Sequence, residues 1–64
     1  MNKYLHFIFH NKKLLGMFYS DCEKWEMVGS KRSLCELVYG KYLPESELSI
    51  LTVNANEIKT VNLE

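Results

Sequence analysis

Residues 3–20 read KYLHFIFHNKKLLGMFYS and have the pattern of a β-hairpin. In residues 4–10, large apolar side chains alternate with positions that carry both polar and apolar residues. This period of two is expected of a strand with two unlike faces. The polar segment 11–13 separates this strand from a second apolar run at 14–19. We therefore expect an N-terminal pair of antiparallel strands, with the rest of the chain organised around it.

Two turn lengths remain open for this hairpin. A two-residue turn at Asn11-Lys12 gathers a core face made of Leu5, Phe7, Phe9, Leu14 and Phe18. The opposite face then carries Tyr4, His6, Ile8, His10, Lys13, Leu15, Met17 and Tyr19. A three-residue loop exchanges the two faces of the second strand, and neither register leaves one face purely polar.

The mixed face of the hairpin is the candidate contact surface. A solvated antiparallel sheet usually alternates cleanly between apolar and polar residues, and this face does not. One interpretation is that a helix or the C-terminal segment covers part of it. The other is an exposed protein-binding surface, because tyrosine and methionine suit interfaces. Its residues would be Tyr4, His6, Ile8, His10, Leu15, Met17 and Tyr19. If the histidines take part, affinity should change between about pH 5.5 and 7.5.

Length, charge and cysteine content limit the classes of protein. The 64 residues allow one domain, spanning 1–64. A chain of this size buries only about 60% of its unfolded surface, so partner binding or self-association would add needed stability. With neither a secretory signal nor a membrane-length apolar run, we expect a cytoplasmic protein with free Cys22 and Cys35 and no membrane partner. The net charge of zero argues against electrostatically driven binding.

Residues 20–30 have two interpretations. Ser20 and Glu23 match a capping box that could open a short helix. Alternatively, residues 24–28 form a third strand with Trp25 and Met27 facing the core. The spacing of two between these apolar residues slightly favours the strand.

An amphipathic helix is predicted next, with one apolar stripe formed by Leu34, Leu37, Val38 and Tyr42. It begins with the capping box Ser33-Leu34-Cys35-Glu36 or at Ser30, and Pro44 ends it. Cys35 lies at the edge of the stripe and is expected to be a small buried apolar residue.

The C-terminal third is predicted to complete the sheet. Residues 48–53 are apolar on both faces, which indicates a strand well inside the sheet, and 57–63 could add a weaker final strand or a pairing tail. The predicted fold class is therefore α+β: a small twisted antiparallel sheet, made of the N-terminal hairpin and C-terminal strands, with one amphipathic helix packed across it.

Reactive side chains do not form a recognisable site in the sequence. On a strand, His6 and His10 lie about 13 Å apart, too far to share one zinc ion, and the cysteines lack a C-x₂₋₄-C spacing. Cys22 or Ser20 beside His6 and Asp21 could form a nucleophile and a base, but no glycine-rich elbow accompanies them. We therefore expect no metal, no cofactor and no enzymatic activity.

A non-catalytic protein-binding module is the function that we expect. The chain is similar, in size and in its order of hairpin, helix and apolar strand, to several small phage-encoded proteins that bind and disable host enzymes. That likeness implies a stoichiometric inhibitor from a phage or mobile element, which would act through the hairpin face or by strand addition at a sheet edge. A homodimer is a third interpretation. The alternative is a nucleic-acid-binding domain with a sheet platform and the basic residues Lys12, Lys13, Lys31 and Arg32.

Overall fold

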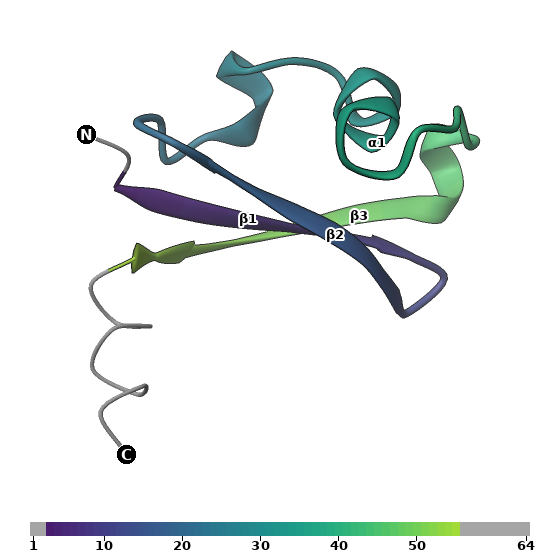
Figure 1. Ribbon diagram of the computed structural model, residues 1–64, viewed down its shortest axis with the longest axis horizontal. Coiled ribbons are helices and arrows are strands. Elements are labelled where there is room, and N and C mark those ends of the chain that lie inside the picture. The colour runs from purple at the N-terminus through teal and green to yellow at the C-terminus, as the bar shows by residue number, and fades with distance from the viewer. Residues whose placement is uncertain (1–2, 56–64) are drawn as a thin grey trace.

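The computed structural model describes residues 3–55, which form a small α+β fold. The elements are β1 (Tyr4–His10), β2 (Lys13–Ser20), the 3-10 helix η1 (Trp25–Met27), α1 (Lys31–Tyr39), the 3-10 helix η2 (Glu45–Glu47) and β3 (Leu48–Asn54). The strands form one antiparallel sheet in the order β2-β1-β3, and α1 packs across one face of it (Figure 1). The predicted fold class is confirmed. The predicted final strand at 57–63 lies outside the described residues.

The hairpin combines features of both predicted registers. Asn11 and Lys12 have φ angles of 48° and 75°, so both central turn residues are left-handed, as in the favoured two-residue hairpin turns. Further along, Phe9 pairs with Leu14 but Ile8 pairs with Gly16, which leaves Leu15 as an extra residue in a β-bulge. Because a shift of one residue exchanges faces, β2 beyond the bulge follows the register expected of the longer loop.

The face of the sheet that α1 covers is the opposite of the predicted core face. Ile8 and His6 have no exposed surface, and Ile8 forms the core with Leu34, Cys35 and Leu48. The helix lies against the sheet beside Gly16, where an added Cβ would come within 3.1 Å of the Val38 side chain. Because the glycine that permits this close approach lies opposite Ile8, the helix packs on the Ile8 face.

Helix α1 begins and ends at specific capping residues. Ser30 is the N-cap, and its hydroxyl accepts a hydrogen bond of 3.1 Å from the backbone N–H of Ser33, so Ser30 is the correct choice of the two predicted starts. Gly40 ends the helix with a φ of 85°, a left-handed conformation that glycine adopts without steric cost. The helix buries Leu34 and Cys35, whereas Leu37 is 69% exposed. The predicted stripe is therefore wrong at Leu37 and at Tyr42, which is 58% exposed and follows the end of α1, and the helix ends at Gly40 and not at Pro44.

One other prediction about the sheet is wrong. Residues 25–27 form a 3-10 helix in place of the favoured third strand, and only Trp25 packs against the core. Within the described sheet, β3 lies at an edge and β1 lies in the centre. On the side of α1, β3 contributes Leu48 and Ile50 to the core, whereas on the other side its Leu51 side chain is 53% exposed.

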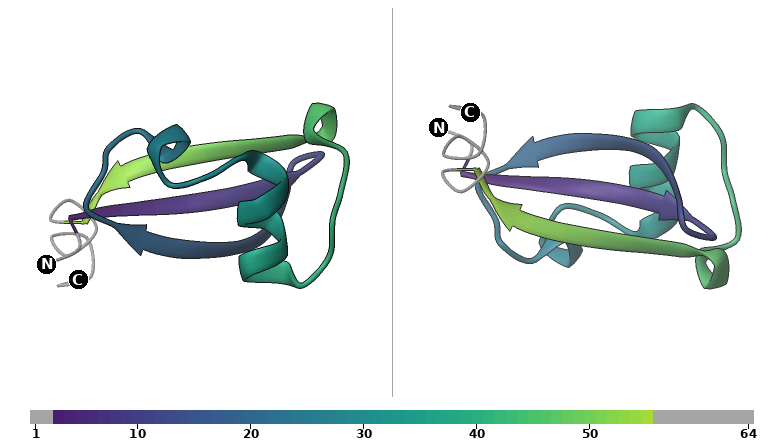
Figure 2. Two further views of the ribbon diagram at one scale, coloured as in Figure 1. Left: turned by 90° about the horizontal axis from the view of Figure 1, so that it is seen from above. Right: turned by 90° about the horizontal axis from the view of Figure 1, so that it is seen from below.

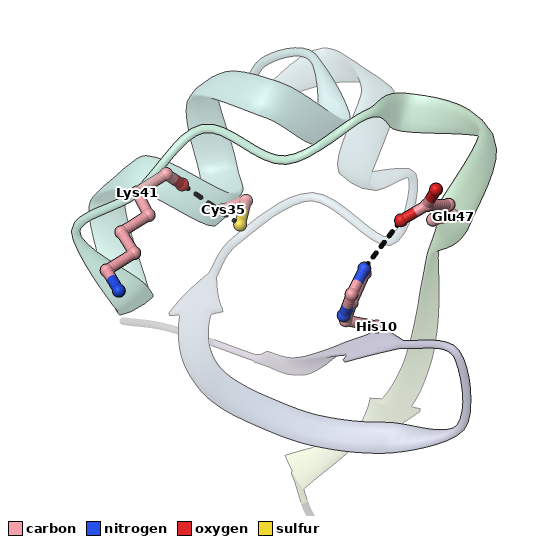
Figure 3. A network of polar contacts seen from close by, with 4 residues as sticks. All are labelled: His10, Cys35, Lys41 and Glu47. Carbon is pink, nitrogen blue, oxygen red and sulfur yellow. Dashed lines mark hydrogen bonds and ion pairs between the residues drawn. The ribbon is translucent and has the colours of Figure 1, made fainter.

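Both cysteines are free, Cys22 at the surface and Cys35 in the core. The Cys35 thiol donates a hydrogen bond of 3.2 Å to the carbonyl oxygen of Lys41, which fastens the chain after α1 (Figure 3). Of the helices formed by residues 3–55, none combines the length and apolarity needed to cross a bilayer.

Candidate protein-binding surface

The sheet face opposite α1 is apolar and has no described helix over it, as the view from below shows (Figure 2). Strand pairing arranges its side chains in three rows. Phe7 of β1 occupies the centre, between Met17 of β2 and Leu51 of β3. The two neighbouring rows are Tyr19, Leu5, Val53 and Leu14, Phe9, Ser49. We call these nine residues the open face and the α1 side the covered face.

The open face carries four large apolar side chains that are about half exposed. Leu14, Met17, Tyr19 and Leu51 are each between 51% and 56% exposed, and Leu5 is buried. At roughly 200 Å² for a large side chain, these four expose on the order of 400 Å². Apolar patches of about 300–600 Å² are the largest on typical monomers and are often functional. No residue of the open face is charged.

The structure divides the predicted contact residues between the two faces. Met17 and Tyr19 lie on the open face. The remaining residues do not: Tyr4, His6, Ile8 and His10 belong to the covered face, and Leu15 packs against the core. The expectation that all seven share one exposed surface is therefore wrong. Sequence reasoning missed Leu5, Phe7, Phe9 and Leu14 as open-face residues because it assigned them to the core.

His6 is a buried polar residue held by side chains of both neighbouring strands. Its Nδ1 atom is 2.8 Å from the Thr52 hydroxyl of β3, and its Nε2 atom is 2.6 Å from the Ser20 hydroxyl of β2. The ring also stacks on Phe18, with 4.7 Å between the ring centroids. Burial lowers the pKa of His6 below its ordinary value of 6.5, against a smaller opposing effect of the Cys22 backbone.

The hydrogen-bond directions assign His6 a structural role. The Ser20 hydroxyl donates to the Cys22 carbonyl oxygen at 2.9 Å and accepts from the Cys22 N–H at 3.2 Å. Since a hydroxyl has only one proton, Ser20 then accepts from His6 Nε2–H, and Thr52 donates to Nδ1. In this neutral tautomer, His6, Ser20 and Thr52 each have a hydrogen-bond partner. Ser20 therefore does not pass its proton to His6, as a nucleophile activated by a base would.

His10 is paired with an acid at the other end of the hairpin. Its Nε2 atom is 2.7 Å from Glu47 Oε1 (Figure 3). The Asn11 N–H donates to the Glu47 carbonyl oxygen at 3.1 Å, so η2 is attached directly to the hairpin turn. His10 thus contributes to the packing of η2 and lies away from the open face.

Two segments carry the four basic residues of the nucleic-acid hypothesis, and η2 contacts both segments. Lys12 lies in the hairpin turn that η2 contacts, and Lys13 begins β2 directly after it. The backbone N–H of Arg32 donates to Glu45 Oε2 at 3.3 Å. Lys31 is next to Arg32 at the start of α1. Glu45 and Glu47 of η2 therefore lie beside the segments that carry these basic residues and reduce their positive potential.

Two of these cations lie over aromatic rings. Lys31 Nζ is 5.9 Å from the Trp25 ring centroid, and Arg32 Cζ is 5.2 Å from that of Tyr42. A hydrogen bond with the Glu36 carboxylate raises the pKa of the Tyr42 phenol above its ordinary value. These contacts occupy the Trp25 and Tyr42 rings, on which a nucleotide base would otherwise stack on this side of the molecule.

A shallow hollow of about 360 Å³ lies at the opposite end of the sheet, lined by Tyr4, Glu23, Thr52, Val53 and Asn54. Glu23 is its one charged lining residue. In the part of the chain that the structure describes, no group of three or more His, Cys, Asp or Glu side chains could hold a metal ion.

Comparison with known proteins adds nothing to this geometry. The sequence matches no protein family, and neither a curated protein nor a solved structure is similar to it.

Proposed function

We propose that this protein is a non-catalytic binding module whose open face packs against an apolar surface of another protein. The observation that carries the proposal is the uncharged area of four half-exposed side chains, Leu14, Met17, Tyr19 and Leu51. Burying apolar surface contributes about 25 cal/mol per Å², so about 400 Å² corresponds to a gross contribution of order 10 kcal/mol before association costs.

The composition of the open face suits a protein partner better than a nucleic acid. Tyrosine and methionine are enriched in protein interfaces, and charged residues are depleted at their centres. Phosphate binding needs an excess of positive charge, whereas the chain has eight basic and eight acidic residues. Nucleic-acid binding through Lys12, Lys13, Lys31 and Arg32 is the alternative, and Glu45 and Glu47 weigh against it.

A stoichiometric inhibitor is the specific form of binding that we propose. A rigid sheet face on a small domain can cover a functional surface of a larger protein without any chemistry of its own. The order of hairpin, helix and apolar strand in a chain of this size supports this proposal only by its likeness to small phage-encoded proteins that bind and disable host enzymes. We place its action in the cytoplasm, where the free thiols of Cys22 and Cys35 would stay reduced.

Matched variants test the proposal once a purified partner is in hand. Leu51→Glu and Met17→Glu put a charge on the open face, and Leu37→Glu and Met27→Glu put the same charge on other exposed surfaces. We expect each open-face variant to weaken binding at least tenfold, since a buried unpaired carboxylate is costly, and the controls to bind normally. Equal binding by all four variants would overturn the proposal and would favour strand addition at the outer edge of β2 or β3.

A salt titration distinguishes binding to a protein from binding to a nucleic acid. Phosphate contacts give an affinity that falls steeply with salt concentration, whereas an apolar surface gives little dependence. We expect a nearly flat profile for the protein partner and only weak, salt-sensitive binding to nucleic acid.

A further inference from the structure

We propose that, when its partner is absent, the open face packs against the open face of a second copy of this chain. This inference rests on the proposed function in using the same surface, and it names an occupant for that surface. The dimer would be two-fold symmetric, with the two sheets face to face and each α1 on the outside.

The charge of the open face permits self-association. A two-fold axis brings each part of a surface against the same surface of a second copy, so a charged patch would meet like charge. The nine residues of the open face include none that is charged, and their polar groups are the hydroxyls of Tyr19 and Ser49. The basic and acidic residues around η2 lie on the hairpin turn, η2 and the start of α1, outside this surface.

The four half-exposed side chains of the open face supply about two thirds of the smallest area that a stable interface buries. Four half-exposed side chains supply on the order of 400 Å² per copy, hence about 800 Å² in a dimer before Phe7, Phe9, Val53 and the rim are included. Stable interfaces bury about 1,200–2,000 Å² in total. Phe7, Phe9 and Val53 are partly exposed in the single chain and add to the contact.

The position of Phe7 defines the centre of the contact. It lies in the middle row of the open face on the central strand, between Met17 and Leu51. A two-fold axis that lies between the sheets and passes over the centre of the open face brings Phe7 opposite its own copy. Sheets packed face to face lie about 10 Å apart, close enough for two phenylalanine rings to stack.

Sedimentation equilibrium over a wide concentration range tests this inference on the full chain. We expect the average mass to rise from one chain to two with concentration. Leu51→Glu should weaken the dimer at least tenfold, because it would bury a charge, and Leu37→Glu should leave it unchanged. Met17→Glu and its control Met27→Glu repeat the comparison at a second position. Circular dichroism identifies any variant that fails to fold.

Three results would overturn the dimer. These are a single-chain mass at every concentration, equal weakening by Leu51→Glu and Leu37→Glu, or association beyond two copies. In each case the partner-binding measurement with the same four variants is independent. If the open-face variants weaken partner binding and the controls do not, the proposed function stands without the dimer. If all four variants bind the partner equally, both proposals fail.

Discussion

The Nε2 atom of His6 lies 2.6 Å from the hydroxyl of Ser20, which links the central strand to β2 in the interior of the protein. The same imidazole contacts Thr52 of β3 at 2.8 Å. One side chain therefore connects all three strands of the sheet. Because the side chain is fully buried, the strength of this connection depends on its protonation state.

The free energy of unfolding should fall in mild acid because of His6. Burial holds its pKa in the folded state below the unfolded value of 6.5. Above pH 6.5 the ring is neutral in both states and the stability is complete. As the pH falls below 6.5, the unfolded chain takes up a proton that the folded chain resists, so stability declines until the pH passes the folded pKa. Urea unfolding from pH 8 to pH 5 measures this.

The matched control for this pH dependence is the second histidine. His6→Gln should flatten the stability profile in this range, whereas His10→Gln should keep the decline. A decline that persists unchanged in His6→Gln would show that another group is responsible.

Removal of either hydroxyl that contacts His6 should destabilise the fold. Thr52→Val keeps the shape of the side chain but leaves Nδ1 of a buried ring without a partner, which costs about 1–3 kcal/mol. Ser20→Ala should have an effect of similar size through Nε2. Ser49→Ala on the open face of β3 is the control and should change the unfolding free energy by less than about 0.5 kcal/mol. An equal effect of Ser49→Ala would contradict the assigned role.

Gly16→Ala should push α1 away from the sheet. The new Cβ would lie 3.1 Å from the Cβ and Cγ2 atoms of Val38, and crowding of this kind costs about 1–3 kcal/mol. Val38→Ala removes one of the crowded atoms. The double variant should therefore lose less stability than the sum of the two single losses, as measured by denaturant unfolding. Simple additivity would mean that the helix does not approach the sheet at Gly16.

The two thiols should differ strongly in reactivity. Cys22 is exposed and should react quickly with a disulfide reagent under native conditions. Cys35 has no exposed surface and should react only as fast as the protein opens. Cys22→Ser should abolish the fast phase alone. A fast phase that remains in this variant would place Cys35 at the surface.

The sequence predicted the elements of this fold better than the faces of its sheet. The hairpin and the helix follow from local patterns, and the two-residue turn is one of the two turn lengths that the sequence left open. The bulge at Leu15 has no such local signal, and it moves Met17 and Tyr19 to the same face as Phe7. Alternation alone could not show which face α1 covers, since both faces of β1 are rich in large side chains.

Gly16 is the residue from which the face covered by α1 could have been predicted. A glycine inside a strand often marks a close approach by another element, and Gly16 lies opposite Ile8. The buried state of His6 was harder to predict, because it needs Ser20 and Thr52, which are far apart in the sequence. Histidine among aromatic residues suggested a contact surface, whereas a complete set of hydrogen bonds makes it a core residue.

The central claim is that the open face is where this protein contacts other chains. A photoreactive amino acid at Met17 tests it directly, with the same residue at the comparably exposed Met27 as the control. After illumination of the protein with its purified partner, or alone at high concentration, we predict a covalent adduct of defined mass from position 17 and little from position 27. An adduct from position 27 alone, or none from position 17 under either condition, would contradict the account.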